Sequence, residues 1–113
     1  MKPGDIILIS LAQFGGGPPK LRPALFLADL PGPYQDVLAC GISTKLTPLR
    51  PDWDEVIRRI DSDFSSSGLH HDSAIRLSYL GSAGAMEVAG VIGSIDPARL
   101  SRFRHRLSDH LRP

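Results

Sequence analysis

The chain has 113 residues, of which 42% are hydrophobic, and its net charge is +1 with neutral histidines. This length predicts a single folded domain spanning residues 1–113. The near-zero net charge excludes a global electrostatic field directed at nucleic acid or at a membrane. No stretch approaches the ~20 apolar residues of a membrane-spanning helix, and the first residues do not resemble a signal peptide, so we expect a cytoplasmic protein without membrane contact.

Three β-strands are predicted in the N-terminal part of the chain. Residues Asp5–Leu11 are apolar and rich in isoleucine, and they lie between glycine–proline segments, which is typical of a short buried strand. Residues Leu21–Asp29 form the second strand. Its Pro23 belongs at the strand start or at an edge, because proline has no backbone N–H to donate. Residues Val37–Ile42 form the third strand, after a turn at residues 30–34.

Residues 53–64 carry two competing patterns. The spacing of the apolar residues and a capping box made by Asp52 and Glu55 predict a helix. The alternation of Val56, Arg58 and Ile60 is typical of a strand instead. The pattern alone favours the helix, with apolar positions at Trp53, Val56, Ile57, Ile60 and Phe64.

A further pair of strands and a helix are predicted in the second half of the chain. Residues Ser73–Leu80 alternate, so we expect Ile75, Leu77 and Tyr79 to face the core and Arg76 and Ser78 to face the other side. A turn is predicted at residues 81–84. Residues Met86–Ile95 form the last strand, in which Gly90 and Gly93 mark possible bulges.

The C-terminal helix is the clearest element. Asp96 is a good N-cap and Pro97 suits the first helical turn. Leucines and Phe103 repeat at helical spacing on one face, and arginines fill the opposite face. Five or six short strands followed by one helix predict a mostly β domain, a small curled sheet or barrel with a helix packed across it.

The order of several short motifs resembles the MazF/PemK toxin family. The motifs are Gly4–Ile9 (GDIILI), Arg22–Leu25 (RPAL), Ile42–Thr44 (IST), Ser73–Leu77 (SAIRL) and Ile95–Asp96. The resemblance implies an SH3-like β-barrel with a C-terminal helix, assembled as a homodimer. It also implies that residues Asp54–Ile60 form a strand.

The same resemblance implies a function. A toxin of a type II toxin–antitoxin system would cleave single-stranded RNA as a sequence-specific, metal-independent endoribonuclease without a cofactor. A cognate antitoxin with a flexible acidic tail would cover the RNA groove, and operator DNA would be bound only through that antitoxin. The sequence shows no grouped Cys and His residues with the spacing of zinc ligands, since Cys40, expected to be a buried and inert thiol, is the only cysteine.

RNA can be cleaved without a metal because its own 2′-hydroxyl attacks the neighbouring phosphate. An arginine suits the stabilisation of the extra negative charge, since its planar guanidinium binds two phosphate oxygens. The resemblance makes Arg22 the first catalytic candidate and Thr44 the second, with Ser43 beside it. The alternatives are that Arg22 pairs with Asp5 or Asp29, and that the hydroxyls satisfy a turn.

The third catalytic candidate is Arg76. In the PemK branch an arginine and an aspartate two residues apart on this strand are proposed as acid and base, but here Ser78 replaces the aspartate. A histidine proposed to assist in the first loop of that branch is also absent. His70 or His71 is the alternative source of a base, and strand alternation predicts that at most one of them points into a cleft.

Other candidates would bind RNA rather than react. Phe14 would stack on a base, and Lys20, Lys45 and Arg50 would contact phosphates, with Ser43 and Ser78 as hydroxyl donors. The arginine-rich helix face, with Arg102, Arg104 and Arg106, is interpreted as a solvated surface or part of the antitoxin contact. Two other functions stay open: a non-enzymatic binding toxin of the gyrase-poisoning CcdB kind, and a catalytically weak homologue that only binds the antitoxin.

Overall fold

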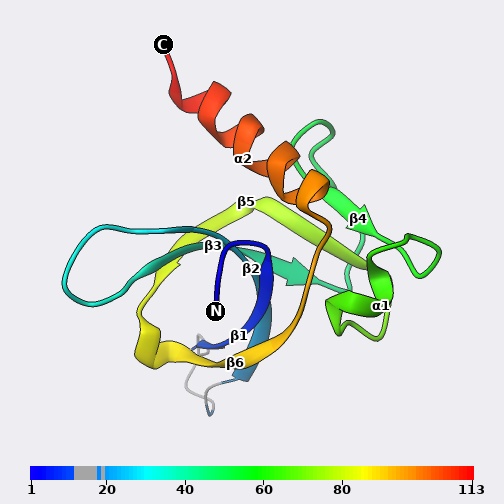
Figure 1. The fold of residues 1–113 in the computed structure, drawn as a ribbon. Coiled ribbons are helices and arrows are strands. Elements are labelled where there is room, and N and C mark those ends of the chain that lie inside the picture. Colours follow the sequence, from blue (N-terminus) through cyan, green and yellow to red (C-terminus); the bar gives the residue numbers. More distant parts are fainter. Residues whose placement is uncertain (12–17, 19) are drawn as a thin grey trace.

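The computed structural model describes residues 1–11, 18 and 20–113. It contains a six-stranded antiparallel sheet with the strand order β4-β5-β3-β2-β1-β6 and a C-terminal helix, α2, that lies across it (Figure 1). This confirms the predicted fold class. The strands are β1 Asp5–Leu11, β2 Lys20–Asp29, β3 Val37–Ser43, β4 Glu55–Ile57, β5 Ser73–Ala83 and β6 Val88–Ser94. The helices are α1 Phe64–Ser67, the 3₁₀ turn η1 Ala85–Glu87 and α2 Pro97–Leu111.

The two N-terminal strands form where the sequence predicts them. β1 pairs with β2 along its length, with Ile6 opposite Leu25 and Leu8 opposite Pro23. The pairing of β2 with β3 begins only at Ala24. Pro23 therefore lies where β2 has one neighbour instead of two, which agrees with the expectation that it would lie at a strand start or edge.

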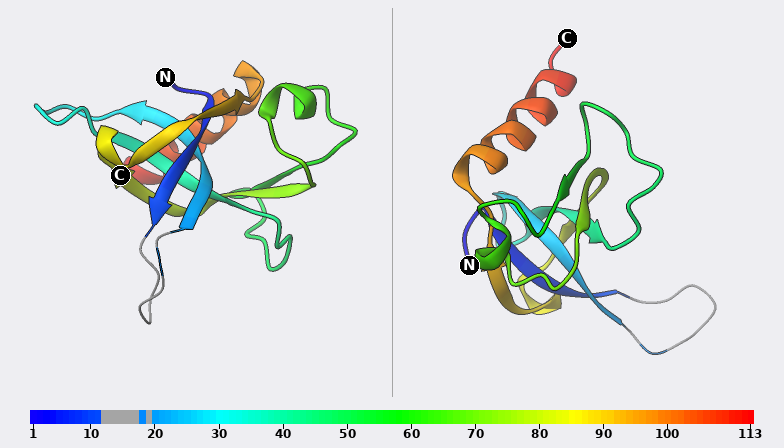
Figure 2. Two further views of the ribbon diagram at one scale, coloured as in Figure 1. Left: turned by 90° about the horizontal axis from the view of Figure 1, so that it is seen from below. Right: turned by 90° about the vertical axis from the view of Figure 1, so that its right-hand side faces the viewer.

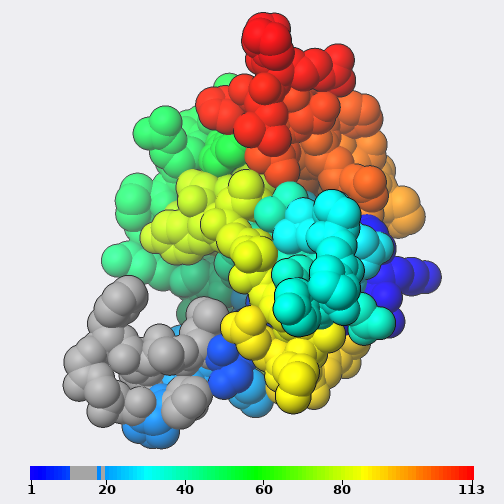
Figure 3. All heavy atoms as spheres, turned by 90° about the vertical axis from the view of Figure 1, so that its left-hand side faces the viewer, coloured from blue at the N-terminus to red at the C-terminus, as the bar shows by residue number. Residues whose placement is uncertain are grey.

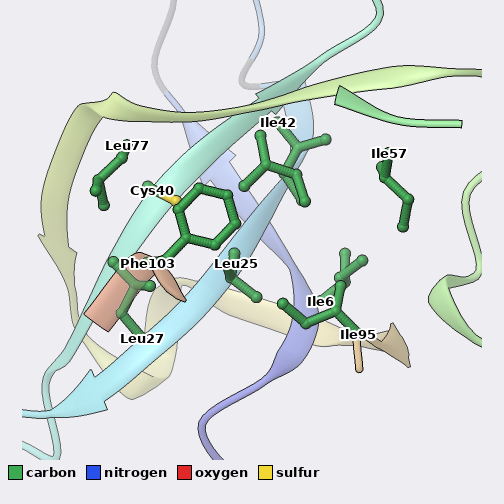
Figure 4. Close-up of a cluster of buried hydrophobic side chains, with 10 residues drawn as sticks. Ile6, Leu25, Leu27, Cys40, Ile42, Ile57, Leu77, Ile95 and Phe103 are labelled. Atoms are coloured by element: carbon green, nitrogen blue, oxygen red, sulfur yellow. The ribbon is translucent and has the colours of Figure 1, made fainter. Parts of the chain in front are cut away.

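Both faces of the sheet are buried, which explains the continuous apolar runs of β1 and β2. One core cluster contains Ile6 and Leu25, and Phe103 of α2 enters it from above the sheet (Figure 4). The second cluster lies on the opposite face and contains the neighbouring residues Ile7 and Phe26. Because successive side chains of a strand alternate between faces, each strand contributes to both clusters.

Residues 53–64 do not form the helix that their spacing predicts. They contain the short strand β4, and the implication drawn from the family resemblance is correct for Glu55–Ile57. Ile57 is buried in the core, whereas Ile60, three residues later, is 90% exposed. Tertiary pairing with β5 therefore prevails over the helical periodicity.

The single helical turn α1 packs closely against β6, on the side of the sheet away from the β2–β3 turn (Figure 2). It ends at Gly68, which has a φ of +75°, and a Cβ there would lie 2.1 Å from the carbonyl oxygen of Ile92. A Cβ on Gly93 would lie 2.3 Å from the carbonyl oxygen of Ser66. Both contacts require glycine, and the register of β6 on β1 shifts next to Gly93, near the predicted bulge.

The predictions for β5 are correct at its start and wrong at its end. The strand continues through the predicted turn to Ala83, which pairs with Val37. Tyr79 does not join the core with Ile75 and Leu77, since it is 64% exposed. The reason is an irregularity in the pairing with β3, described below.

Helix α2 begins as predicted. The Asp96 carboxylate accepts a hydrogen bond from the backbone N–H of Ala98 at 2.7 Å, and Pro97 occupies the first turn. The arginines of this helix are not a purely solvated face, however. Arg99 is buried, and Arg102 and Arg106 both bind Glu55 of β4, at 3.0 and 2.8 Å. Arg106 is therefore partly buried and not part of a solvated face, whereas Arg102 pairs with Glu55 and remains exposed.

Arg99 is the centre of an ion-pair network that joins α2 to β4 and to the segment before α1. Its guanidinium binds Asp63 at 2.8 Å, Glu55 at 2.9 Å and Asp61 at 3.2 Å. Burial alone would raise the pKa of the Glu55 carboxyl, but hydrogen bonding to Arg102 and the charges of the arginines outweigh it and lower that pKa. Asp63 behaves likewise: burial opposes ionisation, and hydrogen bonds from Arg99 and from the Asp96 backbone lower the pKa.

These lowered pKa values predict a loss of stability in acid. A carboxylate whose pKa is lower in the folded state stabilises that state above its unfolded pKa, and this contribution disappears as the pH falls through the folded pKa. We expect the contribution of these two carboxylates to the free energy of unfolding to be constant above about pH 5 and to fall below about pH 4. Urea unfolding of the wild type and of Glu55→Gln between pH 7 and pH 3 measures this. The glutamine variant should show a shallower decline, and an equal decline would contradict the role of Glu55.

Candidate functional site

A cavity of about 790 Å³ opens beside β2, β3 and β5. It is lined by the start of β2, by the end of β3, by the loop that precedes β5 and by the second half of β5. The pairing of Ala24 with Gly41 explains part of this arrangement. Because the strands are antiparallel, Arg22 upstream of Ala24 and Ser43 downstream of Gly41 lie toward the same end of the sheet. Arg22, Ser43 and Thr44 all line the cavity.

Arg22 is an exposed side chain at the cavity. Within the part of the chain that the structure describes, its guanidinium makes no ion pair with Asp5 or Asp29, the two alternatives suggested by the sequence. Asp5 instead accepts a hydrogen bond from the backbone N–H of Lys2 at 2.9 Å. The Arg22 guanidinium is thus available to an anion in the cavity.

The two hydroxyl candidates differ in their surroundings. The Ser43 hydroxyl oxygen accepts a hydrogen bond from the backbone N–H of Lys45 at 3.1 Å, so Ser43 performs the turn-stabilising role considered as the alternative. Thr44 is exposed and lines the cavity. Thr44, with its hydroxyl, and Arg22, with its guanidinium, are therefore both exposed residues that line this cavity.

Arg76 does not occupy the exposed position expected of a residue that binds a phosphate. Its side chain is only 6% exposed, and its guanidinium donates to the backbone carbonyls of Pro48 and, at 2.7 Å, Lys45. It also lies 4.0 Å from the buried carboxylate of Asp54. A phosphate would have to displace these partners, so the geometry makes Arg76 a residue that holds the segment after β3 in place.

Ser78 is exposed, but it hydrogen-bonds to the buried Asp54 of the same network. Its backbone N–H and its hydroxyl both donate to the Asp54 carboxylate, at 3.1 and 3.2 Å. Asp54 also accepts from the backbone N–H of Arg50 at 3.1 Å. Ser78 is not a lining residue of the cavity, which leaves its expected RNA contact without structural support. Asp54, which sequence reasoning missed, fixes this network from 24 residues away, and no local pattern reveals it.

His70 and His71 both line the cavity, which differs from the expectation that at most one would. They lie in a bend before β5 instead of in a strand, so strand alternation does not apply to them. The bend is held by its backbone: the Arg59 guanidinium donates to the His70 carbonyl at 2.8 Å, and the Ser73 hydroxyl donates to the His71 carbonyl at 2.8 Å. The Arg59 backbone N–H also donates to Asp72 at 2.8 Å.

The remaining candidates for RNA binding are not lining residues of the cavity or lie outside the residues that the structure describes. Lys20, Lys45 and Arg50 are exposed and are not lining residues of the cavity. Phe14 lies outside the described residues. Tyr79, which the sequence pattern assigned to the core, is a lining residue of the cavity. No signal in the period-two pattern distinguishes it from Ile75 and Leu77.

Cys40 is buried, as predicted, although it is one of the residues that line the cavity. Burial, together with the negative charge of Asp54, raises the pKa of its thiol to about 12. At neutral pH this cysteine is protonated and a poor nucleophile. Among residues 1–11, 18 and 20–113, no group of three or more His, Cys, Asp or Glu side chains is arranged to hold a metal ion.

Comparisons with known proteins give matches among solved structures. No protein-family model matches the chain, and no curated protein matches it in sequence. Among solved structures, the chain is similar to an endoribonuclease in complex with its cognate antitoxin from Mycobacterial species, with a TM-score of 0.64 and 17% sequence identity. The match covers 98% of this chain and 94% of that chain, so the two share a fold over nearly their whole length. Within the described residues, no helix combines the length and the apolar character needed to cross a membrane.

Proposed function

We propose that this chain is the toxin of a type II toxin–antitoxin system and that it cleaves single-stranded RNA without a metal. The observation that carries the proposal is one cavity that is lined by two exposed residues, Arg22 with its guanidinium and Thr44 with its hydroxyl. The shared fold with an endoribonuclease of a toxin–antitoxin complex supports the same reading. Because fold alone does not determine activity, these two side chains, and not the fold, carry the proposed function.

In the proposed reaction, the 2′-oxygen of one nucleotide attacks the adjacent phosphorus and the bond to the 5′-oxygen of the next nucleotide breaks. The products are a 2′,3′-cyclic phosphate and a 5′-hydroxyl. Arg22 binds two non-bridging phosphate oxygens and stabilises the additional negative charge that develops on them. Thr44 donates a hydrogen bond that orients the phosphate for in-line attack.

One proton must leave the 2′-hydroxyl and another must reach the 5′-oxygen. His70 and His71 are the titratable side chains of the bend that lines the cavity, and histidine exchanges protons near neutral pH. Arg76 is not assigned a proton-transfer role, because it is buried and bound to carbonyl oxygens. This proposal replaces the base that is missing at Ser78.

Single substitutions of the two histidines test this assignment. We expect His70→Asn or His71→Asn to lower the cleavage rate by about 10²- to 10⁴-fold, the range of general acid–base catalysis. Asparagine keeps a side chain that can form hydrogen bonds but cannot exchange a proton. The measurement is single-turnover cleavage of a short RNA as a function of pH. If both variants keep the wild-type rate and pH profile, neither histidine is the base.

The partners follow from the same proposal. An antitoxin with an acidic, flexible segment would lay its carboxylates against Arg22 and block the access of RNA. The chain would act in the cytoplasm as one domain and as a homodimer, with sequence-specific cleavage of mRNA and with operator DNA bound only through the antitoxin. No cofactor is required by the reaction as written.

Incubation of the purified protein with a long single-stranded RNA in excess chelator tests the activity directly. We expect cleavage at a small set of sites and complete inhibition by the antitoxin. Loss of cleavage on addition of chelator would contradict the metal-free mechanism. Binding to the antitoxin without cleavage of any RNA would identify a catalytically weak homologue, and poisoning of gyrase without RNA cleavage would identify the binding-toxin alternative.

A further inference from the structure

Tyr79 is exposed because the pairing of β5 with β3 is irregular. Cys40 of β3 pairs with Leu80, whereas the next residue, Gly41, pairs with Arg76. Three residues of β5 are therefore accommodated between two consecutive positions of β3. Leu77 stays in the core, and Tyr79 is displaced to the surface, where 64% of it is exposed.

Two residues, Gly41 and Arg76, lie close to the exposed tyrosine side chain. Gly41 lies against it, since a Cβ built on Gly41 would be 3.4 Å from the Tyr79 Cβ. The guanidinium carbon of Arg76 lies 5.5 Å from the ring centroid. Arg76 is itself fixed by the Lys45 and Pro48 carbonyls, so the ring is supported by a rigid network. A ring held in this way loses little conformational freedom when it binds a ligand.

Tyr79 is part of the candidate site. Tyr79 lines the same cavity as Arg22 and Thr44. The second half of β5 lies at the surface on the face below α2 (Figure 3). Single-stranded RNA exposes unstacked bases on both sides of each phosphate, and proteins bind such bases by stacking them on aromatic side chains.

We propose that Tyr79 is a nucleobase-stacking platform for a base that flanks the phosphate bound by Arg22. The inference rests on the proposed function and adds a binding subsite to it. Stacking tolerates all four bases, so Tyr79 contributes affinity and position while other groups select the sequence. It is a binding residue, and no proton transfer is assigned to its hydroxyl.

The test is the affinity for a fully 2′-O-methylated RNA oligonucleotide of a sequence that the wild type cleaves. This probe cannot supply the attacking 2′-hydroxyl, so binding is measured apart from the reaction. We expect Tyr79→Ala and Tyr79→Leu to weaken binding about 5- to 100-fold, the range of a lost base–aromatic stack. Tyr79→Phe should bind within about twofold of the wild type, because it keeps the ring.

Tyr34 provides a matched control, since it is also an exposed tyrosine, at 78%, but it is not a lining residue of the cavity. Tyr34→Ala should bind as the wild type does, and thermal unfolding of each variant establishes that it is folded. A probe with one abasic position should reproduce the loss in the wild type and add no further loss in Tyr79→Ala at the position that stacks. Wild-type affinity of Tyr79→Ala and Tyr79→Leu, or an equal loss in Tyr79→Phe, would overturn the stacking role while RNA cleavage by the wild type stands. Absence of both binding and cleavage by the wild type would overturn the proposed function itself.

Discussion

Substitution of Arg22 by alanine is expected to lower the rate of RNA cleavage by about 10²- to 10³-fold, which is the usual effect of removing a group that stabilises transition-state charge. The same variant should unfold within about 1–2 °C of the wild type, because surface substitutions without partners change stability by less than about 0.5 kcal/mol. Arg22 is exposed and makes no ion pair among the described residues. Single-turnover kinetics and thermal unfolding measure the two effects separately.

Two further variants test whether the loss of cleavage is specific to the Arg22 guanidinium. Arg22→Lys keeps the charge but not the two-pronged geometry, so we expect an intermediate rate. Arg104→Ala removes an exposed arginine of α2 that is not a lining residue of the cavity, and it should cleave at the wild-type rate. An equal loss of cleavage in Arg22→Ala and Arg104→Ala would mean that the loss comes from the removal of any positive charge and not from the Arg22 cavity.

Substitution of Arg76 by alanine, unlike that of Arg22, is expected to lower the free energy of unfolding. It removes a guanidinium whose side chain is 6% exposed, and it leaves the fully buried Asp54 carboxylate without its nearest cation. Breaking a buried ion pair of this kind costs about 3–5 kcal/mol in the free energy of unfolding. Urea unfolding measures this loss.

The control for Arg76 is Arg58→Ala, which removes an exposed ion pair with Asp72. Exposed pairs contribute about 0–1 kcal/mol, so this variant should be nearly as stable as the wild type. If Arg76→Ala keeps wild-type stability and loses cleavage, then Arg76 acts in catalysis, as the sequence resemblance suggested, and the structural role assigned to it is wrong.

The elements that local chemistry specifies were predictable from the sequence. β1 has the predicted bounds, and the capping carboxylate and proline of α2 are in the predicted positions. β4 was not predictable from its periodicity, because Ile57 enters the core through pairing with β5 while Ile60 remains exposed. The pairing of Arg102 and Arg106 with Glu55 was not predictable, because Glu55 is more than 40 residues away from both in the sequence.

The candidate site was predictable only in part, and for the same reason. The motif order places Arg22 and Thr44 near strand ends, and both line the same cavity. The burial of Arg76 depends on Asp54 and on the carbonyls of the segment after β3, which no strand pattern encodes. The exposure of Tyr79 depends on a shift of register by three residues between β3 and β5, and because side chains alternate with a period of two, a shift by an odd number of residues reverses the face of a side chain.

The central claim is that the Arg22 cavity receives an RNA phosphate, and nuclear magnetic resonance of the arginine side chains tests it most directly. The Nε–H signals of Arg22 and Arg104 are followed while the 2′-O-methylated oligonucleotide is added. We expect the Arg22 signal to shift in proportion to occupancy and the Arg104 signal to stay in place. An unmoved Arg22 signal at saturating oligonucleotide would contradict the account.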